Sequence, residues 1–192
     1  MKTKTLTFIL LIIVFFSFCD SDNSTGPKNK PPFIVTIANP SFEIFNDSGK
    51  PANWNLTEWR PKITIVEKDS TVKTDGSYSL KSTIPDSLPN DVRFNQEITV
   101  EKNTHYNIRC DIKTENHKLY QDKTMGAGFF ITAGNLAFFS DTLLTGTTNW
   151  TNVQVNFNSY NHDFVTITLH IGYICNTNTG IVWFDNLKIS KL

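Results

Sequence analysis

The chain has 192 residues, of which 39% are hydrophobic, and it carries 18 basic and 18 acidic side chains. This balance excludes the strongly basic surface that nucleic-acid binding requires. Beyond a short N-terminal segment, the length suits one domain with a hydrophobic core.

Residues 1–19 are expected to form a targeting segment. Lys2 and Lys4 give it a positively charged start, and residues 6–18 are almost wholly apolar. An apolar run of about 7–15 residues is typical of a signal peptide, whereas a membrane-spanning helix needs roughly 20. The segment therefore predicts that the protein is exported.

Cys19 follows the apolar run directly, which resembles the lipobox of bacterial lipoproteins, where the cysteine is acylated. Ser17 fits that pattern, whereas Phe16 and Phe18 depart from it. Ordinary secretion with cleavage after Cys19 is the alternative. We expect a lipid-anchored protein at the bacterial cell envelope or surface, with no membrane contact besides the lipid.

Residues 20–35 are expected to form a flexible linker. Their first part, 20–32, is rich in Asp, Ser, Asn, Lys and Pro and has no apolar residue with which to build a core. A spacer of this kind would separate an anchored Cys19 from a folded domain, which we expect to span residues 36–192.

The sequence from 36 to 192 predicts an all-β fold. Short apolar and polar runs alternate between breaks rich in Asn, Gly, Asp and Ser, and no long window keeps a helical period. The predicted strands are 63–68, 78–83, 93–100, 106–113, 125–132, 152–158, 165–173 and 181–190. This number of short strands is typical of an antiparallel β-sandwich.

Alternation within the strands assigns their faces. Arg109 and Asp111 lie on the polar face of strand 106–113, and His170 lies on the polar face of strand 165–173. The other face of each strand is apolar. We therefore expect two sheets packed face to face, each solvated on its outside.

Cys110 and Cys175 are the two cysteines of the expected domain. Cys110 occupies an apolar position in its strand, so we interpret it as a small core residue. A disulfide between the two cysteines is the alternative, since an exported protein permits one.

A set of short segments occurs in a recognisable order along the chain. They are NPSFE at 39–43, PANW at 51–54, DGSYSL at 75–80, QEITV at 96–100, YNIR at 106–109, WTNV at 150–153 and GIVWFDNL at 180–187. Their order and spacing resemble the galactose-binding-like jelly rolls, in particular the carbohydrate-binding modules of the family 4/9/22 type. The resemblance implies a jelly-roll β-sandwich that binds carbohydrate.

The same resemblance implies a structural calcium ion that ties the N-terminal segment to the last strand. Glu43 and Asp185 match the two carboxylate positions, and oxygens of Ser41 and of the turn that begins at Lys73 complete the expected ligand set. Calcium takes about six to eight oxygen ligands, so carboxylates from distant segments are suitable. The alternative is that Glu43 is a solvated turn residue and Asp185 caps a bulge.

Sugar binding needs exposed aromatic rings, on which a sugar stacks its apolar face, beside polar groups that pair with its hydroxyls. The candidates by that rule are Trp59, Arg60, Arg109, Asp111, Tyr120 and His170. Trp59 lies in a polar stretch, and packing over the sandwich edge is its alternative. Arg109 and His170 lie on polar faces of the kind that carry the ligand cleft in the resembling modules, and solvated cross-strand pairs are the alternative.

Several other side chains have expected positions near this cleft. Of the adjacent Phe129 and Phe130, one is expected in the core and the other on the outside, because neighbouring strand residues face opposite ways. Phe138 and Phe139 are expected in a loop beside the cleft. Gln96 is expected to face inward and to be hydrogen-bonded, because it lies two residues from the apolar Ile98 and so shares its face.

Motifs for catalysis are missing from the sequence: it has no HExxH, no GxSxG and no phosphate-binding glycine loop. We therefore expect a non-catalytic carbohydrate-binding module that captures poly- or oligosaccharide, alone or within a glycan-processing complex. The alternative is a structural or adhesive β-sandwich that binds a protein or another envelope component, which would show an exposed apolar patch instead.

Overall fold

The computed structural model describes residues 32–120, 124–174 and 176–192. Contacts divide the chain into Met1–Pro32 and Phe33–Leu192, and every strand lies in the second unit. The expected targeting segment, its Cys19 and most of the linker lie outside the described residues, as does Cys175.

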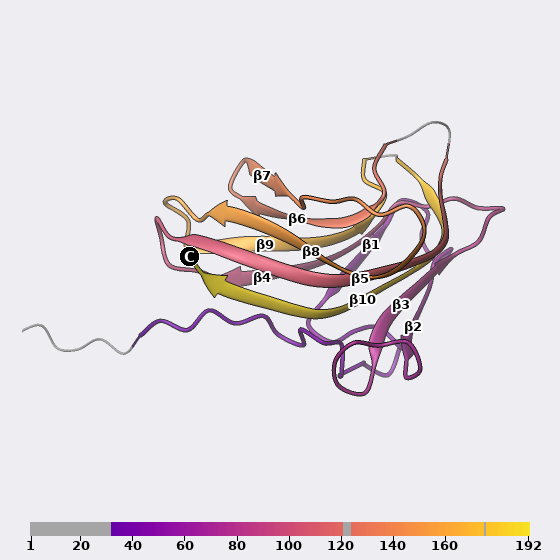
Figure 1. The fold of residues 1–192 in the computed structure, drawn as a ribbon, viewed down its shortest axis with the longest axis horizontal. Coiled ribbons are helices and arrows are strands. Elements are labelled where there is room, and N and C mark those ends of the chain that lie inside the picture. The colour runs from indigo at the N-terminus through magenta and orange to yellow at the C-terminus, as the bar shows by residue number, and fades with distance from the viewer. Residues whose placement is uncertain (1–31, 121–123, 175) are drawn as a thin grey trace, which may run out of the picture. The chain divides into compact units, whose positions relative to one another are not determined.

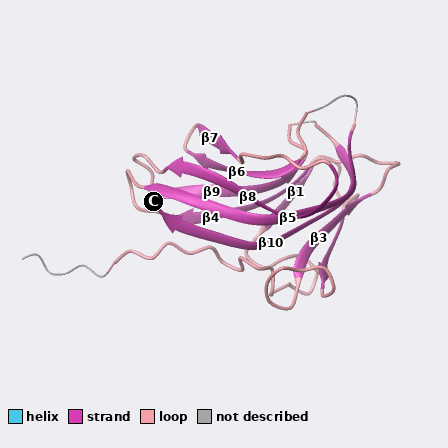
Figure 2. Cartoon of the chain, in the orientation of Figure 1, coloured by secondary structure: helices cyan, strands magenta, loops and turns pink. Residues whose placement is uncertain are grey.

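The described part of the chain contains ten strands and no helix, so it has no helix that could span a membrane. The strands are β1 Asn55–Glu58, β2 Ile65–Asp69, β3 Ser79–Ile84, β4 Val92–Thr99, β5 His105–Leu119, β6 Ala127–Ala133, β7 Leu136–Phe139, β8 Gly146–Asn158, β9 Phe164–Ile171 and β10 Asn178–Lys191. Figure 2 shows this all-β content.

The strands form two five-stranded antiparallel sheets (Figure 1). The first sheet has the order β1-β4-β9-β6-β7, and the second sheet has the order β2-β3-β10-β5-β8. In Figure 1, β5 and β10 of the second sheet pass in front of β4 and β9 of the first. The predicted antiparallel β-sandwich is therefore confirmed.

All of the strands predicted from the sequence have a counterpart, but the structure adds β1 and β7, each of four residues. Strands this short carry little alternation to detect. The sequence also predicted too early an end for β5, because register shifts between Ile112 and Thr114 and between Thr114 and His117 interrupt its alternation.

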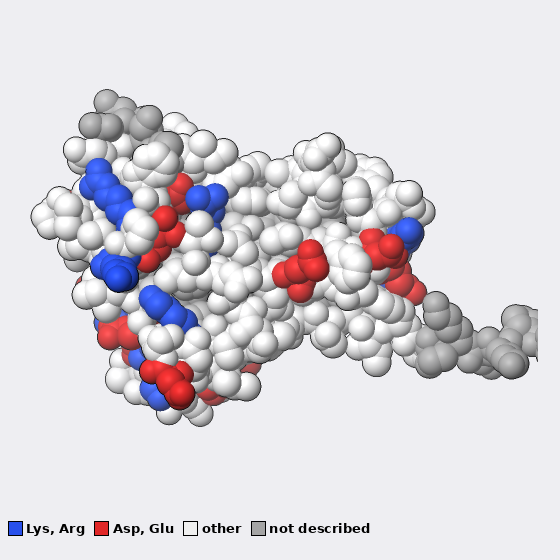
Figure 3. Space-filling model, turned by 180° about the vertical axis from the view of Figure 1, so that it is seen from behind, with Lys and Arg blue, Asp and Glu red and all other residues white. Residues whose placement is uncertain are grey.

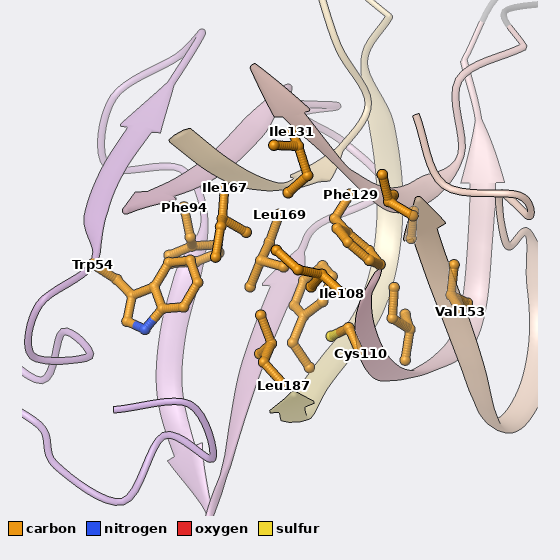
Figure 4. Packing of buried hydrophobic residues seen from close by; sticks show 14 of the residues in the cluster. Trp54, Phe94, Ile108, Cys110, Phe129, Ile131, Val153, Ile167, Leu169 and Leu187 are labelled. Carbon is orange, nitrogen blue, oxygen red and sulfur yellow. The ribbon is translucent and has the colours of Figure 1, made fainter. Parts of the chain in front are cut away.

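The core lies between the two sheets and consists of inward-facing side chains from both (Figure 4). Phe94 of the first sheet and Phe184 of the second are fully buried, and their ring centroids lie 6.5 Å apart. Phe129 is likewise fully buried, as one of the adjacent pair was expected to be. Cys110 is a free, fully buried thiol whose pKa is raised by burial, which fits the interpretation as a small core residue.

Gln96 joins the N-terminal segment to the first sheet. Its side-chain Nε2 donates to the carbonyl oxygens of Ala38 at 2.9 Å and Asn53 at 3.1 Å, and its Oε1 accepts from the backbone N–H of Ala38 at 2.7 Å. Val35 and Ile37 of the same segment pack against the core. The prediction of an inward, hydrogen-bonded Gln96 is confirmed.

His117 of β5 makes stability depend on pH. The side chain is buried, its ring nitrogens have no hydrogen-bond partner among the described residues, and burial lowers its pKa to about 4. In the unfolded chain, a histidine binds a proton near pH 6.5. Between pH 6.5 and 4 the unfolded state therefore binds a proton that the folded state does not, which costs up to about 3 kcal/mol of stability.

We expect His117→Leu to lose less stability than the wild type between pH 7 and pH 4.5, as measured from urea unfolding midpoints. The exposed His105 on the same strand provides the matched control, and His105→Leu should keep the wild-type loss. Equal losses in the wild type and in His117→Leu would contradict a neutral, buried His117.

Candidate functional site

The candidate site is the outer face of the first sheet, which carries a group of packed rings. We call four residues the aromatic cluster: Phe130 of β6, Phe139 of β7, His170 near the end of β9 and Tyr173, which follows β9. The ring centroid of Phe130 lies 5.0 Å from that of Phe139, 4.9 Å from that of Tyr173 and 5.7 Å from that of His170. Phe130 is therefore the centre of the cluster.

The cluster has a buried layer and an exposed layer. Phe130 is 4% exposed and His170 is fully buried, whereas Phe139 is 44% exposed and Tyr173 is half-buried. Phe130 faces outward, as one of the adjacent pair with Phe129 was expected to, but the rings above cover it. Phe139 lies in β7 and not in the expected loop. The exposed rings of Phe139 and Tyr173 thus rest on a fixed support.

His170 supports the turn that carries Tyr173. Its Nδ1 donates to the carbonyl oxygen of Gly172 at 3.1 Å, and Gly172 has a positive φ of 75°, which favours glycine. Burial lowers the pKa of His170 to about 4, so the ring is neutral at pH 7. The sequence correctly placed His170 on the polar face of its strand, but the prediction that this position is solvated is wrong.

Arg93 of β4 lies directly opposite His170 in the sheet register. Its Nε lies 3.4 Å from Oδ1 of the buried Asp91, and its guanidinium carbon lies 5.7 Å from the centroid of the Tyr173 ring. The second contact is a cation–π interaction. Asp91 thus balances the charge of Arg93, and Tyr173 orients its guanidinium group.

A polar row crosses the same face beside the aromatic cluster. Thr168 of β9 donates its hydroxyl to Oδ1 of Asn95 at 2.9 Å, and Nδ2 of Asn95 contacts Oγ1 of Thr57 at 3.4 Å. In the sheet register, Thr168 pairs with both Asn95 and Phe130. Amide and hydroxyl groups in fixed positions therefore adjoin the aromatic rings.

Trp59 lies just beyond β1 at the edge of this face and is 56% exposed. Its backbone N–H donates to the carbonyl oxygen of Asp91 at 2.9 Å. The buried side chain of Asn90 holds the loop after it, accepting from the N–H of Arg60 at 2.8 Å and donating to Oγ1 of Thr64 at 3.0 Å. Hydrogen bonds with Asn90 therefore hold the loop that follows Trp59 in place.

Arg60 and Tyr120 lie at the same end of the sandwich. Asn90, which binds Arg60, forms an isolated bridge with Asn178, and the N–H of Tyr120 donates to the carbonyl oxygen of Thr177 at 3.1 Å. Three candidate residues from the sequence therefore lie at one end of the sandwich: Trp59, Arg60 and Tyr120. His170 lies buried in the first sheet near the same end.

Arg109 and Asp111 do not belong to this site, because they lie on β5 of the second sheet. The carboxylate of Asp111 accepts hydrogen bonds from Nδ2 of Asn152 at 2.7 Å and of Asn186 at 2.8 Å. The sequence interpretation that grouped Arg109 and Asp111 with His170 in one cleft is corrected: the two polar faces belong to opposite sheets.

The residues expected to bind calcium surround the turn that begins at Lys73, and they are joined to this turn by hydrogen bonds. Asp185 is buried, burial raises its pKa, and its Oδ2 accepts from the N–H of Thr74 at 2.7 Å and of Asp75 at 3.0 Å. Ser41 donates its hydroxyl to Oδ2 of Asp75 at 2.7 Å. The carboxylate of Glu43 accepts from the N–H of Ser77 at 2.9 Å.

The hydrogen bonds from these N–H groups use the same oxygens of Glu43 and Asp185 that would have to coordinate a calcium ion. Among the described residues, no three Asp, Glu, His or Cys side chains form a group that could hold a metal ion. The arrangement of Glu43 and Asp185 therefore does not fit calcium unless the turn from Lys73 to Tyr78 rearranges. The calcium site stays a prediction.

A chelator tests that prediction directly. If calcium binds, removing it should lower the melting temperature of the wild type by roughly 5–10 °C, because a ligand bound only to the native state stabilises it by about 2.7 kcal/mol at a hundredfold excess over its Kd. Glu43→Ala and Asp185→Ala should not respond to the chelator. An unchanged wild-type melt would contradict the calcium site.

A surface pocket of about 270 Å³ lies elsewhere, between the segment at Phe45 and strand β2. Its lining residues are Phe45, Asn46, Asp47, Gly49, Val66, Glu67 and Lys68. None of them belongs to the first sheet, so this pocket is not part of the aromatic face.

The outer face of the first sheet carries few charged side chains. Figure 3 looks from the side opposite to Figure 1, onto the first sheet, and shows few charged side chains in the middle of the surface. The charged groups gather toward the two ends. A ligand on this face therefore meets mainly aromatic and neutral polar groups.

Among solved structures, three similar chains are informative about the fold. The enzymatically active domain of tailspike protein 4 from bacteriophage CBA120 has a TM-score of 0.59 at 14% identity, over 83% of this chain and 22% of that one. TmCBM61 in complex with β-1,4-galactotriose has a TM-score of 0.55 at 14% identity, over 83% and 100%. A CBM4 module has a TM-score of 0.51 at 17% identity, over 82% and 100%.

The chain thus spans about a fifth of the tailspike chain and the whole of the two modules. No protein-family model matches the sequence, and the search of curated proteins found no match. The chain has the antiparallel β-sandwich fold of the carbohydrate-binding modules.

Proposed function

We propose that the chain is a non-catalytic carbohydrate-binding module that captures poly- or oligosaccharide on the outer face of its first sheet. The observation that carries the proposal is that one sheet face presents three exposed or half-buried rings, Trp59 beside β1, Phe139 on β7 and Tyr173 between them, together with the fixed polar groups of Arg93 and Asn95. This combination matches the apolar faces and the hydroxyl groups of a sugar.

Preorganisation favours binding at this face. The loop of Trp59 is held by Asn90, and the turn of Tyr173 is held by His170. Groups that are already ordered lose little conformational entropy when a ligand binds, so more of the contact energy appears as affinity.

The acidic groups of this face support a binding role over hydrolysis. Asp91 is buried beside Arg93 just before β4, and Glu97 of β4 lies six residues further along the chain, about 20 Å away at roughly 3.3 Å per residue. The two carboxyl groups of a glycosidase stand about 5–9.5 Å apart across the scissile bond. Asp91 and Glu97 are too distant to act as such a pair.

A glycan panel tests the proposal. The purified chain should bind at least one polysaccharide among β-1,4-galactan, xylan, cellulose, mannan and mixed-linkage glucan in affinity gels, without releasing reducing sugar. The first probe follows from TmCBM61, whose solved complex contains β-1,4-galactotriose. Failure to bind any member of a broad panel would contradict the proposal, and release of reducing sugar would contradict its non-catalytic part.

A structural or adhesive role is the second candidate. Leu136 and Tyr160, near the β6–β7 end of the first sheet, are exposed apolar side chains of the kind found in protein-binding patches. The two roles differ in one measurement: an adhesive module would bind cell-envelope protein in a pull-down that excess oligosaccharide does not disturb.

We also propose that the module is exported and anchored by a lipid on Cys19, a proposal supported by the sequence of residues 1–19 alone. A detergent phase-partitioning experiment tests it in bacterial cells that express the full chain. The wild type should enter the detergent phase, and Cys19→Ser should enter the aqueous phase. Equal partitioning of both would favour ordinary secretion.

A further inference from the structure

Phe164 stands apart from the aromatic cluster on the same outer face. It begins β9, pairs with Thr99 of β4 and is 54% exposed. Residues two apart on a strand share a face, so Phe164 lies on the side that carries Thr168 and His170. Its ring packs against no other aromatic ring within the part of the chain that the structure describes.

The surface between Phe164 and the cluster contains only short or polar side chains. Thr166 of β9 and Thr132 of β6 are paired and half-buried, Ala137 of β7 is exposed beside Thr132, and Glu97 of β4 is exposed beside Thr166. No large side chain from these positions blocks the path. The face is therefore open along the strands.

The length of this path follows from strand geometry. Phe164 and His170 are six residues apart on β9, which corresponds to about 20 Å at roughly 3.3 Å per residue. A span of this length accommodates several linked sugar rings, whereas a single ring would reach only one end. Trp59, Tyr173 and Phe139 lie at or near the His170 end.

We propose that Phe164 is a second stacking station and that the site holds the interior of a linear polysaccharide laid along the strands, from Trp59 and Tyr173 to Phe164. This inference rests on the proposed function. The charges indicate an uncharged chain: Glu97 is exposed in the middle of the path, and Asp163 beside Phe164 already pairs with Lys102 at 3.2 Å. A polyuronate would meet like charge at Glu97.

Two stations on one ligand produce a dependence on chain length. Once one part of an oligosaccharide is bound at Trp59, the contact with Phe164 is intramolecular and adds affinity without a second association cost. Affinity should therefore rise with chain length until the ligand reaches Phe164, and then level off.

Calorimetric titrations with galacto-, xylo- and cello-oligosaccharides from disaccharide to hexasaccharide test the inference. In the series that binds, Phe164→Ala should weaken the longest ligands roughly tenfold and leave the shortest unchanged, while Trp59→Ala should weaken all of them. Phe164→Trp should retain the rise with length. Ile65→Ala, which removes a 58% exposed side chain from β2 of the second sheet, is the matched control and should behave as wild type.

The outcomes separate this inference from the proposed function. If the wild type binds oligosaccharide and Phe164→Ala equals the wild type at every length, the second station is overturned and the proposed function stands. If the wild type binds no glycan of the panel, both are overturned.

Discussion

Trp59→Ala is expected to weaken glycan binding by about 2 kcal/mol, or roughly 30-fold, without lowering the melting temperature. Trp59 is 56% exposed, so removing the indole costs little core packing. The same indole provides the largest accessible aromatic surface at the rim of the first sheet. Its loss therefore removes stacking energy that only the complex contains.

The control for this variant comes from the opposite sheet. Arg109→Ala removes an exposed polar side chain from β5 of the second sheet and should leave both affinity and melting temperature unchanged. Affinities measured by calorimetry against the best polysaccharide of the panel would decide. A larger loss of affinity in Arg109→Ala than in Trp59→Ala would place the site on the second sheet and contradict the account.

Phe94→Ala is expected to destabilise the domain by about 3–5 kcal/mol. The Phe94 ring is fully buried and lies 6.5 Å from Phe184 of the opposite sheet, so its removal leaves a cavity between the two sheets. A typical domain has only about 5–15 kcal/mol of stability, so the variant should unfold at a much lower denaturant concentration.

Phe164→Ala makes the matched comparison for Phe94→Ala, because it removes the same side chain from an exposed position of the same sheet. It should change stability by no more than about 0.5 kcal/mol. Urea unfolding followed by tryptophan fluorescence would measure both. Similar losses in the two variants would contradict the burial of Phe94 between the sheets.

Much of the fold could be predicted from the sequence because burial on one side imposes alternation. That pattern is clear in β9, where Ile167 and Leu169 are fully buried, and in β4 around Phe94. It is missing in β1 and β7, which are short edge strands with one neighbour each. Each has only four residues, which is too few for an alternating pattern to stand out from the sequence around it.

The candidate site was predictable only in part. The exposure of Trp59 could be predicted because the residue lies in a polar stretch of the sequence. Grouping His170 with Arg109 failed because alternation shows which face of its own strand a residue occupies, but not which strands share a sheet. The strand order places β5 and β9 in different sheets.

Arg93 and Tyr173 were missed for related reasons. Arg93 was inside a predicted strand, but the position of its guanidinium group depends on contacts with Asp91 and Tyr173. Tyr173 lies in a turn 80 residues further along the chain. One local signal was available: Asp91, which precedes β4, and Arg93 are two residues apart, so their opposite charges point to the same side of the extended chain. Tyr173 had no comparable signal.

Two buried asparagines explain how the rim keeps its shape. Asn90 holds the loop of Trp59, and Asn178, which bridges to it, donates its Nδ2 to the carbonyl oxygen of Met125 at 2.8 Å. Both side chains are buried, where unpaired amides are costly, so these bonds are maintained. The loops around the aromatic face are thus connected to each other and to the core.

The most direct test of a glycan site on the first sheet is an NMR titration of the labelled chain with the best-binding oligosaccharide of the panel. The largest chemical-shift changes are expected at the Trp59 indole and at the backbone amides of Arg93 and Tyr173, with little change at Arg109. Changes confined to the outer face of the second sheet, or to the pocket beside Phe45, would contradict the site.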